Sequence, residues 1–199
     1  GLSAASDVYT EQCSDIVVID GTFNNEPLIS NSTDALAESI IIATGNTLTI
    51  DEASSLTISG GFTNSGTVTL NSTENDFSSL IVEGTAAGDV VYNRYVNSYT
   101  NGWDLIGSPV AMTIADFITA NGANIEIIGG DYAFSQWDNV NKQWIPYATA
   151  SQEGSFTAGQ GYSMATITGA TQAYTGPIVT TTQSVSILNS GGSGAYRRW

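Results

Sequence analysis

The sequence reads TLTI at residues 47–50, SLTI at residues 55–58 and TVTL at residues 67–70, and these three tetrads decide the fold class. Within each tetrad apolar residues alternate with Ser or Thr, which places the apolar side chains on one face of an extended strand. The tetrads start about 8 to 12 residues apart, and this spacing is too short for helical crossovers. Turn formers lie between them, such as GG at residues 60–61 and NSG at residues 64–66. The pattern predicts a series of strand–turn units.

Similar β-rich tetrads flank this stretch, with IVVI at residues 16–19, IIIA at residues 40–43 and SLIV at residues 79–82. We therefore expect an all-β chain whose residues 15–84 form a right-handed parallel β-helix-like solenoid, in which each coil buries its apolar face against the next. An antiparallel sandwich built from hairpins is the alternative, because strands at this spacing suit that fold as well. Residues 1–14 are expected to form an N-terminal cap or linker.

The composition changes near residue 85, and all four Trp residues follow Tyr92. We predict that residues 85–199 form an aromatic-rich β-sandwich module. One short helix is expected at residues 113–120, because Thr113 can cap its start, Asp116 occupies the capping-box position and Asn121-Gly122 can end it. Further strands are expected at residues 125–128, 132–137, 143–147, 161–167 and 184–188.

Five motifs follow one another in the second half: YNRYV at residues 92–96, GWDLIGSPV at 102–110, YAFSQWD at 132–138, NKQWIPY at 141–147 and FTAGQGYSM at 156–164. Their order resembles a β-sandwich module of large surface proteins of Bacteroidota, especially those exported by the type IX secretion route. The resemblance implies an extracellular or cell-surface location after removal of a signal peptide. Residues 195–199, AYRRW, resemble the start of a second segment of that module, which implies a module truncated at residue 199.

The charge is scarce and one-sided. The chain has 19 acidic and 4 basic residues and a net charge of -15, and no Lys or Arg precedes Arg94. Nucleic acid is not expected as a partner, because phosphate binding needs clustered cations. Direct membrane insertion is not expected either, since no run of about 18 apolar residues occurs. The expected partners are other surface proteins, copies of the same chain or extracellular glycans. The single Cys, Cys13, cannot form an intrachain disulfide.

The residue inventory disfavours an enzyme. The absence of His excludes Ser-His-Asp and Cys-His machinery in their usual form and also histidine metal sites. Paired carboxylates support glycoside hydrolysis in some proteins, so Asp51, Glu52, Glu74 and Asp76 are candidates. They lie in predicted turns without neighbouring aromatic or Arg residues, which favours solvated loops. We expect no catalytic residues.

The aromatic residues of the second half are candidates for a ligand-binding platform, because aromatic faces stack on sugar rings. The set comprises Trp103, Tyr132, Trp137, Trp144 and Tyr162, with Tyr147 beside them. Packing in the core or between modules is the competing interpretation, and the alternation around Trp137 and Trp144 suggests that at least one of them faces the core.

Oxygen-bearing side chains at Asp138, Asn139 and Asn141 faintly resemble the start of a calcium loop. The later Gly and Glu of such a loop are missing, and clusters of this kind between two strands are ordinary hairpin turns. We therefore expect a turn here, no metal and no cofactor, with calcium as the one candidate ion.

Taken together, these features predict a non-catalytic extracellular surface component, adhesin-like or fibre-forming. The alternative is a carbohydrate-binding accessory module of a larger secreted glycan-degrading enzyme.

Overall fold

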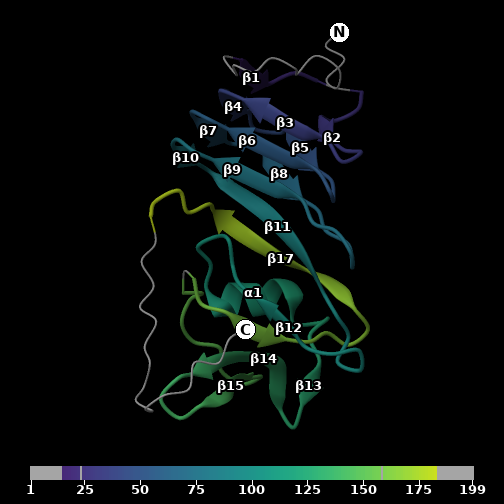
Figure 1. Ribbon diagram of the computed structural model, residues 1–199, viewed down its shortest axis with the longest axis vertical. Helices are drawn as coiled ribbons and strands as arrows, with labels where there is room; N and C mark the ends of the chain where they lie inside the picture. The colour runs from purple at the N-terminus through teal and green to yellow at the C-terminus, as the bar shows by residue number, and fades with distance from the viewer. Residues whose placement is uncertain (1–14, 23, 158, 183–199) are drawn as a thin grey trace, which may run out of the picture.

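The computed structural model describes residues 15–22, 24–157 and 159–182 (Figure 1). In this part of the chain a parallel β-solenoid of about three turns precedes an antiparallel sheet region with one short helix. The predicted cap at residues 1–14, strand at 184–188 and segment at 195–199 lie outside the described residues.

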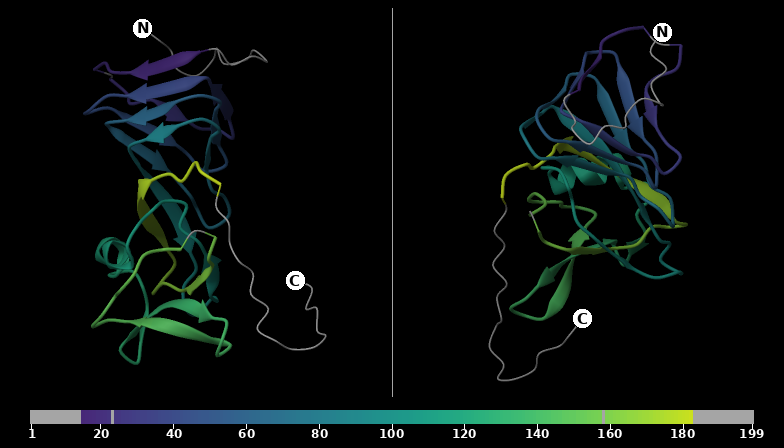
Figure 2. Two further views of the ribbon diagram at one scale, coloured as in Figure 1. Left: turned by 90° about the vertical axis from the view of Figure 1, so that its left-hand side faces the viewer. Right: turned by 45° about the horizontal axis from the view of Figure 1, so that its top comes forward.

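Each coil of the solenoid contributes one strand to each of three parallel sheets (Figure 2). The first coil holds β1 (Ile16–Ile19), β2 (Leu28–Ile29) and β3 (Asp34–Ala37). The second holds β4 (Ser39–Ile42), β5 (Thr47–Ile50) and β6 (Ser55–Ile58). The third holds β7 (Phe62–Asn64), β8 (Thr67–Leu70) and β9 (Ser79–Val82).

The TLTI and TVTL tetrads stack directly on each other as β5 and β8, with Leu48 opposite Val68 and Ile50 opposite Leu70. All four of these side chains are buried, as the alternation predicts. The SLTI tetrad pairs instead with SLIV, as β6 and β9. The parallel solenoid is thus confirmed, and the hairpin alternative is wrong for this half. Hydrogen bonds of side chains between neighbouring coils join residues 20 to 25 positions apart, so one coil is about that long. Tetrads only 8 to 12 residues apart therefore lie in the same coil and belong to different sheets.

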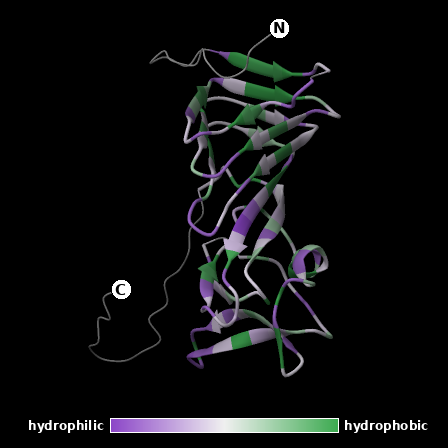
Figure 3. Ribbon diagram, turned by 90° about the vertical axis from the view of Figure 1, so that its right-hand side faces the viewer, coloured by the Kyte–Doolittle hydropathy of each residue, from purple (hydrophilic) through white to green (hydrophobic). Residues whose placement is uncertain are grey.

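The solenoid core consists of inward-facing aliphatic columns, one from each sheet. Ile42, Ile50 and Ile58 come from the three sheets and are fully buried. Burial of a side chain of this size stabilises the fold by about 1.5–3 kcal/mol. Figure 3 shows hydrophobic residues (green) on the solenoid strands interspersed with residues of intermediate hydropathy (near-white).

One sheet joins the solenoid to the second part of the chain. After β10 (Ala86–Ala87), which pairs with β7, the strand β11 (Asp89–Val96) pairs in parallel with β8. On its other side β11 pairs along its whole length with the antiparallel strand β17 (Ala170–Pro177). The boundary predicted at residue 84 therefore falls in the turn between β9 and β10, and the solenoid sheets continue past it.

The second part is built on an antiparallel sheet with the strand order β12-β16-β14-β13, to which β15 adds beside β14. Its strands are β12 (Asp104–Ile106), β13 (Ile127–Ile128), β14 (Asp131–Asp138), β15 (Gln143–Ala148) and β16 (Tyr162–Met164). An aromatic cluster fills the core here, with ring centroids 4.8 to 5.8 Å apart. It consists of Phe117, Phe134, Phe156, Tyr162 and Tyr174.

The predicted helix is present as α1 (Ile114–Asn121). The Thr113 hydroxyl accepts a hydrogen bond from the Asp116 backbone N–H at 3.0 Å, as the capping prediction requires. At the other end Asn121 binds β17, since its side chain donates to the Ala173 carbonyl and accepts from the Ala173 N–H. The helix is thereby joined to the sheet that continues the solenoid.

Candidate functional site

The predicted aromatic platform is divided by the fold into buried and exposed members. Tyr162 is 1% exposed, and its hydroxyl accepts a hydrogen bond from the Thr157 N–H at 3.0 Å. Tyr132 and Tyr147 are half-buried and pack against the core. Tyr147 stacks on Phe134 at 4.9 Å, and burial raises the pKa of its hydroxyl to about 12. Tyr162 therefore belongs to the core, where a ligand in solution does not reach it.

Trp137 and Trp144 lie directly opposite each other on the β14–β15 hairpin, and they are 41% and 42% exposed. Their ring centroids are 5.3 Å apart with planes at 64°, so the two indoles do not form a flat platform. The expectation that one of them faces the core is wrong. The register of β14 against β15 is regular from Ser135 to Asp138, so the exposure of Trp137 does not come from a shift in register. Beyond Gln136, β14 pairs with β15 and no longer with β16, so this end of the hairpin projects.

The hairpin turn uses the oxygen atoms that were candidates for calcium. One carboxylate oxygen of Asp138 accepts from the N–H groups of Val140 and Asn141, and the other accepts from the Asn141 side chain at 2.7 Å. These hydrogen bonds, led by that of the Asn141 side chain, lower the pKa of Asp138. The Asn139 side-chain oxygen accepts from Lys142. The geometry is that of the predicted turn.

Asp51 is the first member of a ladder of polar side chains on the solenoid. Asn71 donates to an Asp51 oxygen at 3.0 Å, and Asn93 donates to the Asn71 side-chain oxygen at 3.2 Å, so three successive coils are linked. In the described ranges no group of three Cys, His, Asp or Glu side chains is placed to hold a metal.

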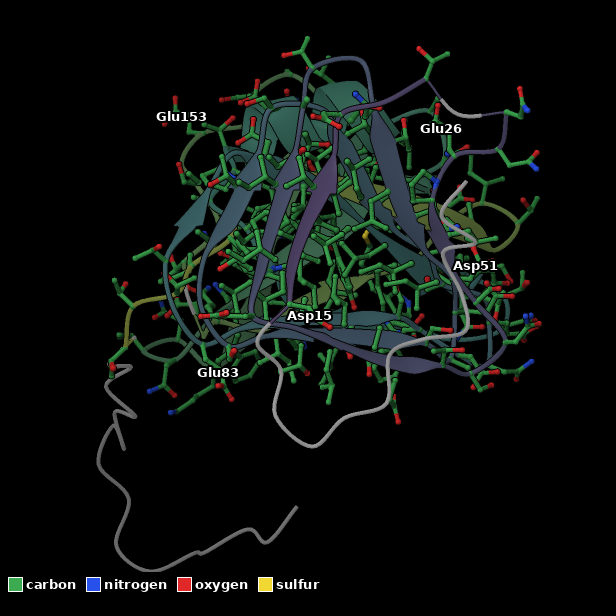
Figure 4. The ribbon with its side chains drawn as sticks, turned by 90° about the horizontal axis from the view of Figure 1, so that it is seen from above. Asp15, Glu26, Asp51, Glu83 and Glu153 are labelled. Atoms are coloured by element: carbon green, nitrogen blue, oxygen red, sulfur yellow. The ribbon has the colours of Figure 1, made fainter. Side chains whose placement is uncertain are left out.

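Figure 4 shows Glu26, Asp51, Glu83 and Glu153 toward the edges of the view and Asp15 nearer its centre, all apart from one another. Glu52, Glu74 and Asp76 are surface residues of the solenoid turns, partly or largely exposed. The candidate carboxylates are therefore placed in turns, as expected for solvated loops.

A second exposed aromatic pair lies in the loop that joins β11 to β12. Trp103 was a candidate from the sequence, whereas its partner Tyr99 was missed. Both residues are 44% exposed, and their rings meet edge to face with centroids 6.0 Å apart. The signal in the sequence is the pair of aromatic residues four positions apart on either side of an Asn-Gly turn.

A shallow apolar groove of about 200 Å³ lies where the third coil meets the second part of the chain. Phe77, Leu80 and Tyr92 line it from the solenoid side, and Val110 and Ile178 from the other. At its rim the Arg94 guanidinium lies 5.6 Å from the centre of the Phe77 ring, in cation–π contact.

No protein-family model matches the chain, and neither a curated protein nor a solved structure matches it. Within residues 15–22, 24–157 and 159–182 there is no helix with the length and apolarity needed to span a membrane.

Proposed function

We propose that this chain is a non-catalytic extracellular surface component, adhesin-like or fibre-forming, whose solenoid is a stalk and whose second part is a contact module. The observation that carries the proposal is the sheet with strand order β17-β11-β8-β5-β2, which runs without interruption from the first coil into the second part. A rigid connection of this kind transmits the position and orientation of a contact module. An enzyme would not need a rigid connection of this kind to turn over its substrate.

The stiffness of the stalk comes from the way its coils are joined. Each coil bonds to the next through three parallel ladders and through polar side chains such as Ser55, which donates to Asp34. Because every coil contacts its neighbours in the same way, the resistance to bending is shared along the axis. At the end of the stalk, the full-length pairing of β11 with β17 holds the second part.

The resemblance to surface proteins of Bacteroidota supports a cell-surface location and is part of the proposal. Two of the motifs behind it pair with each other, because β12 lies in GWDLIGSPV and β16 lies in FTAGQGYSM. The acidic surface keeps such a protein soluble and disfavours adsorption on anionic lipid. The partners that we propose are other surface proteins, copies of the chain or extracellular glycans.

The second candidate function is that of a carbohydrate-binding accessory module of a larger secreted enzyme. The exposed indoles of Trp103, Trp137 and Trp144 favour it, because aromatic faces bind sugar rings. The angle between Trp137 and Trp144 opposes binding of one extended glycan across both rings.

Retention under flow tests the proposal. Beads coated with the chain are passed over surfaces that carry immobilised neutral glycans or the same chain, and beads coated with an unrelated acidic protein are the control. Electron microscopy of the concentrated protein scores filaments in parallel. We expect retention above the control, or filaments, without release of reducing ends from polysaccharides. Inert passage together with monomers at every concentration contradicts the proposal, and so does sustained release of reducing ends.

A further inference from the structure

We propose that the loop from Asn97 to Asp104 is a preformed binding site for a neutral glycan, with the Trp103 indole as its stacking surface and the Tyr99 ring, whose plane lies at 76° to the indole, as a side wall. The inference rests on the proposed function, since it names the ligand class of the contact module.

The Tyr99–Trp103 pair lies in a loop, which distinguishes it from the other exposed pair. Trp137 and Trp144 sit opposite each other on adjacent strands, where a cross-strand aromatic pair stabilises a hairpin by about 0.5–1.5 kcal/mol. Tyr99 and Trp103 lie in a loop and join no two strands. Large aromatic side chains that are held partly exposed in a loop are typical of contact sites.

Polar contacts at the base of the loop fix its two ends. The Asp104 carboxylate accepts from the Asn97 N–H at 2.7 Å and from the Asn97 side chain at 3.1 and 3.2 Å. The Tyr99 N–H donates to the Thr166 carbonyl at 2.7 Å, and the buried Thr166 hydroxyl donates to the carbonyls of Val96 and Asn97. The loop is therefore tied to the core next to β16.

The tip of the loop is a tight turn between the two rings. The Ser98 carbonyl accepts from the N–H groups of Asn101 and Gly102, and the hydroxyls of Ser98 and Thr100 are 3.2 Å apart. Gly102 has a φ of 129°, a conformation that other residues rarely adopt. Because these hydrogen bonds already fix the loop backbone, the loop loses little conformational entropy when a ligand contacts the rings.

The size and chemistry of this surface fit a sugar better than a protein. Apart from the two rings, the loop offers an exposed hydroxyl at Thr100 and an exposed amide at Asn101, which suit the hydroxyls of a pyranose ring. A stable protein interface buries about 800 Å² on each partner, whereas a sugar ring needs only one aromatic face and a few hydrogen bonds. The net charge of -15 disfavours anionic glycans.

Isothermal titration calorimetry with cellohexaose, laminarihexaose and mannohexaose tests the site, and hexagalacturonate serves as the anionic comparison. We expect at least one neutral hexasaccharide to bind the native chain. Trp103→Ala should weaken that binding roughly tenfold, the equivalent of about 1.4 kcal/mol, and Tyr99→Ala should weaken it less. Trp103→Phe should retain most of the affinity because the phenyl ring still stacks.

Trp144→Ala is the matched control, since it removes an equally exposed indole outside the loop. It should leave the affinity unchanged. Circular dichroism melts establish that the Trp103 variants fold, and we expect their midpoints within about 2–4 °C of the native value.

Four results overturn the inference: binding of none of the neutral hexasaccharides, equal affinity of Trp103→Ala and the native chain, an equal loss in Trp144→Ala, or tighter binding of hexagalacturonate. Loss of self-association in Trp103→Ala, seen by sedimentation, instead assigns the loop to a protein contact. Bead retention or filament formation by the Trp103→Ala variant distinguishes the two proposals. If the variant still shows retention or filaments, and no neutral hexasaccharide binds the native chain, the proposed function stands and the glycan site is refuted.

Discussion

Replacing Gly84 by Ala should destabilise the solenoid sharply, because two successive coils touch backbone to backbone at this corner. A Cβ atom on Gly84 would overlap the carbonyl oxygen of Gly60 in the preceding coil, and it would lie 2.7 Å from the carbonyl carbon of Gly60. Ordinary carbon–carbon contacts begin near 3.5 Å, so the coils must separate by about 0.8 Å. The φ of Gly84 is outside the left-handed region, and the penalty is therefore one of contact between coils.

The magnitude follows from what this separation disturbs. Overpacking costs about 1–3 kcal/mol. The hydrogen bonds from Phe62 N–H to Thr85 O at 2.8 Å and from Glu83 N–H to Ile58 O at 2.9 Å flank the corner and would lengthen, at about 0.5–1.5 kcal/mol each. We expect a loss of about 3 kcal/mol in the free energy of unfolding and a fall of roughly 6–12 °C in the melting midpoint.

Gly61→Ala is the matched control, because Gly61 directly follows Gly60, the contact partner of Gly84. Its Cβ would meet the Ser39 hydroxyl oxygen at 3.7 Å, an ordinary contact, and its φ is also outside the left-handed region. It should stay within about 0.5 kcal/mol of the native chain or be slightly more stable. Urea unfolding followed by circular dichroism measures all three proteins. If Gly84→Ala unfolds at the same urea concentration as Gly61→Ala, the close packing of the coils at this corner is refuted.

Two further predictions concern the second part of the chain. Thr113→Ala should lower the free energy of unfolding by about 1 kcal/mol, because the Asp116 N–H loses its cap, and Thr113→Ser should restore it in the same urea assay. Stability should also fall as the pH rises from 10 to 12, because burial holds the pKa of Tyr147 at about 12 and raises that of Tyr174, whereas unfolded Tyr ionises near 10. Thermal melts over this range should show a smaller fall for Tyr147→Phe, and an unchanged fall would contradict the assignment.

Local alternation made the solenoid predictable, and the same reasoning failed at the end of the second-part hairpin, where β14 extends beyond its partner β16. Leu48 and Ile50 point inward as their alternation with Thr indicates, because β5 is regular. Trp137 lies past the last pair between β14 and β16, so it is exposed despite the alternation. The position of Trp103 was visible in its motif, but its contact with Tyr99 depends on the loop geometry that Thr166, a residue distant in sequence, helps to hold.

By itself, the sequence determined that the chain is β-structured and that one helix begins after Thr113, and it favoured parallel coils over hairpins in the first half. These properties follow from local patterns of polarity and capping, which act over a few residues. Only the tertiary structure decided which tetrads stack, how β17 continues the solenoid sheet, and which aromatic residues are exposed. Those outcomes depend on pairing between segments far apart in the chain, such as β11 with β17, and the register of such pairs is set by the packing of the whole core.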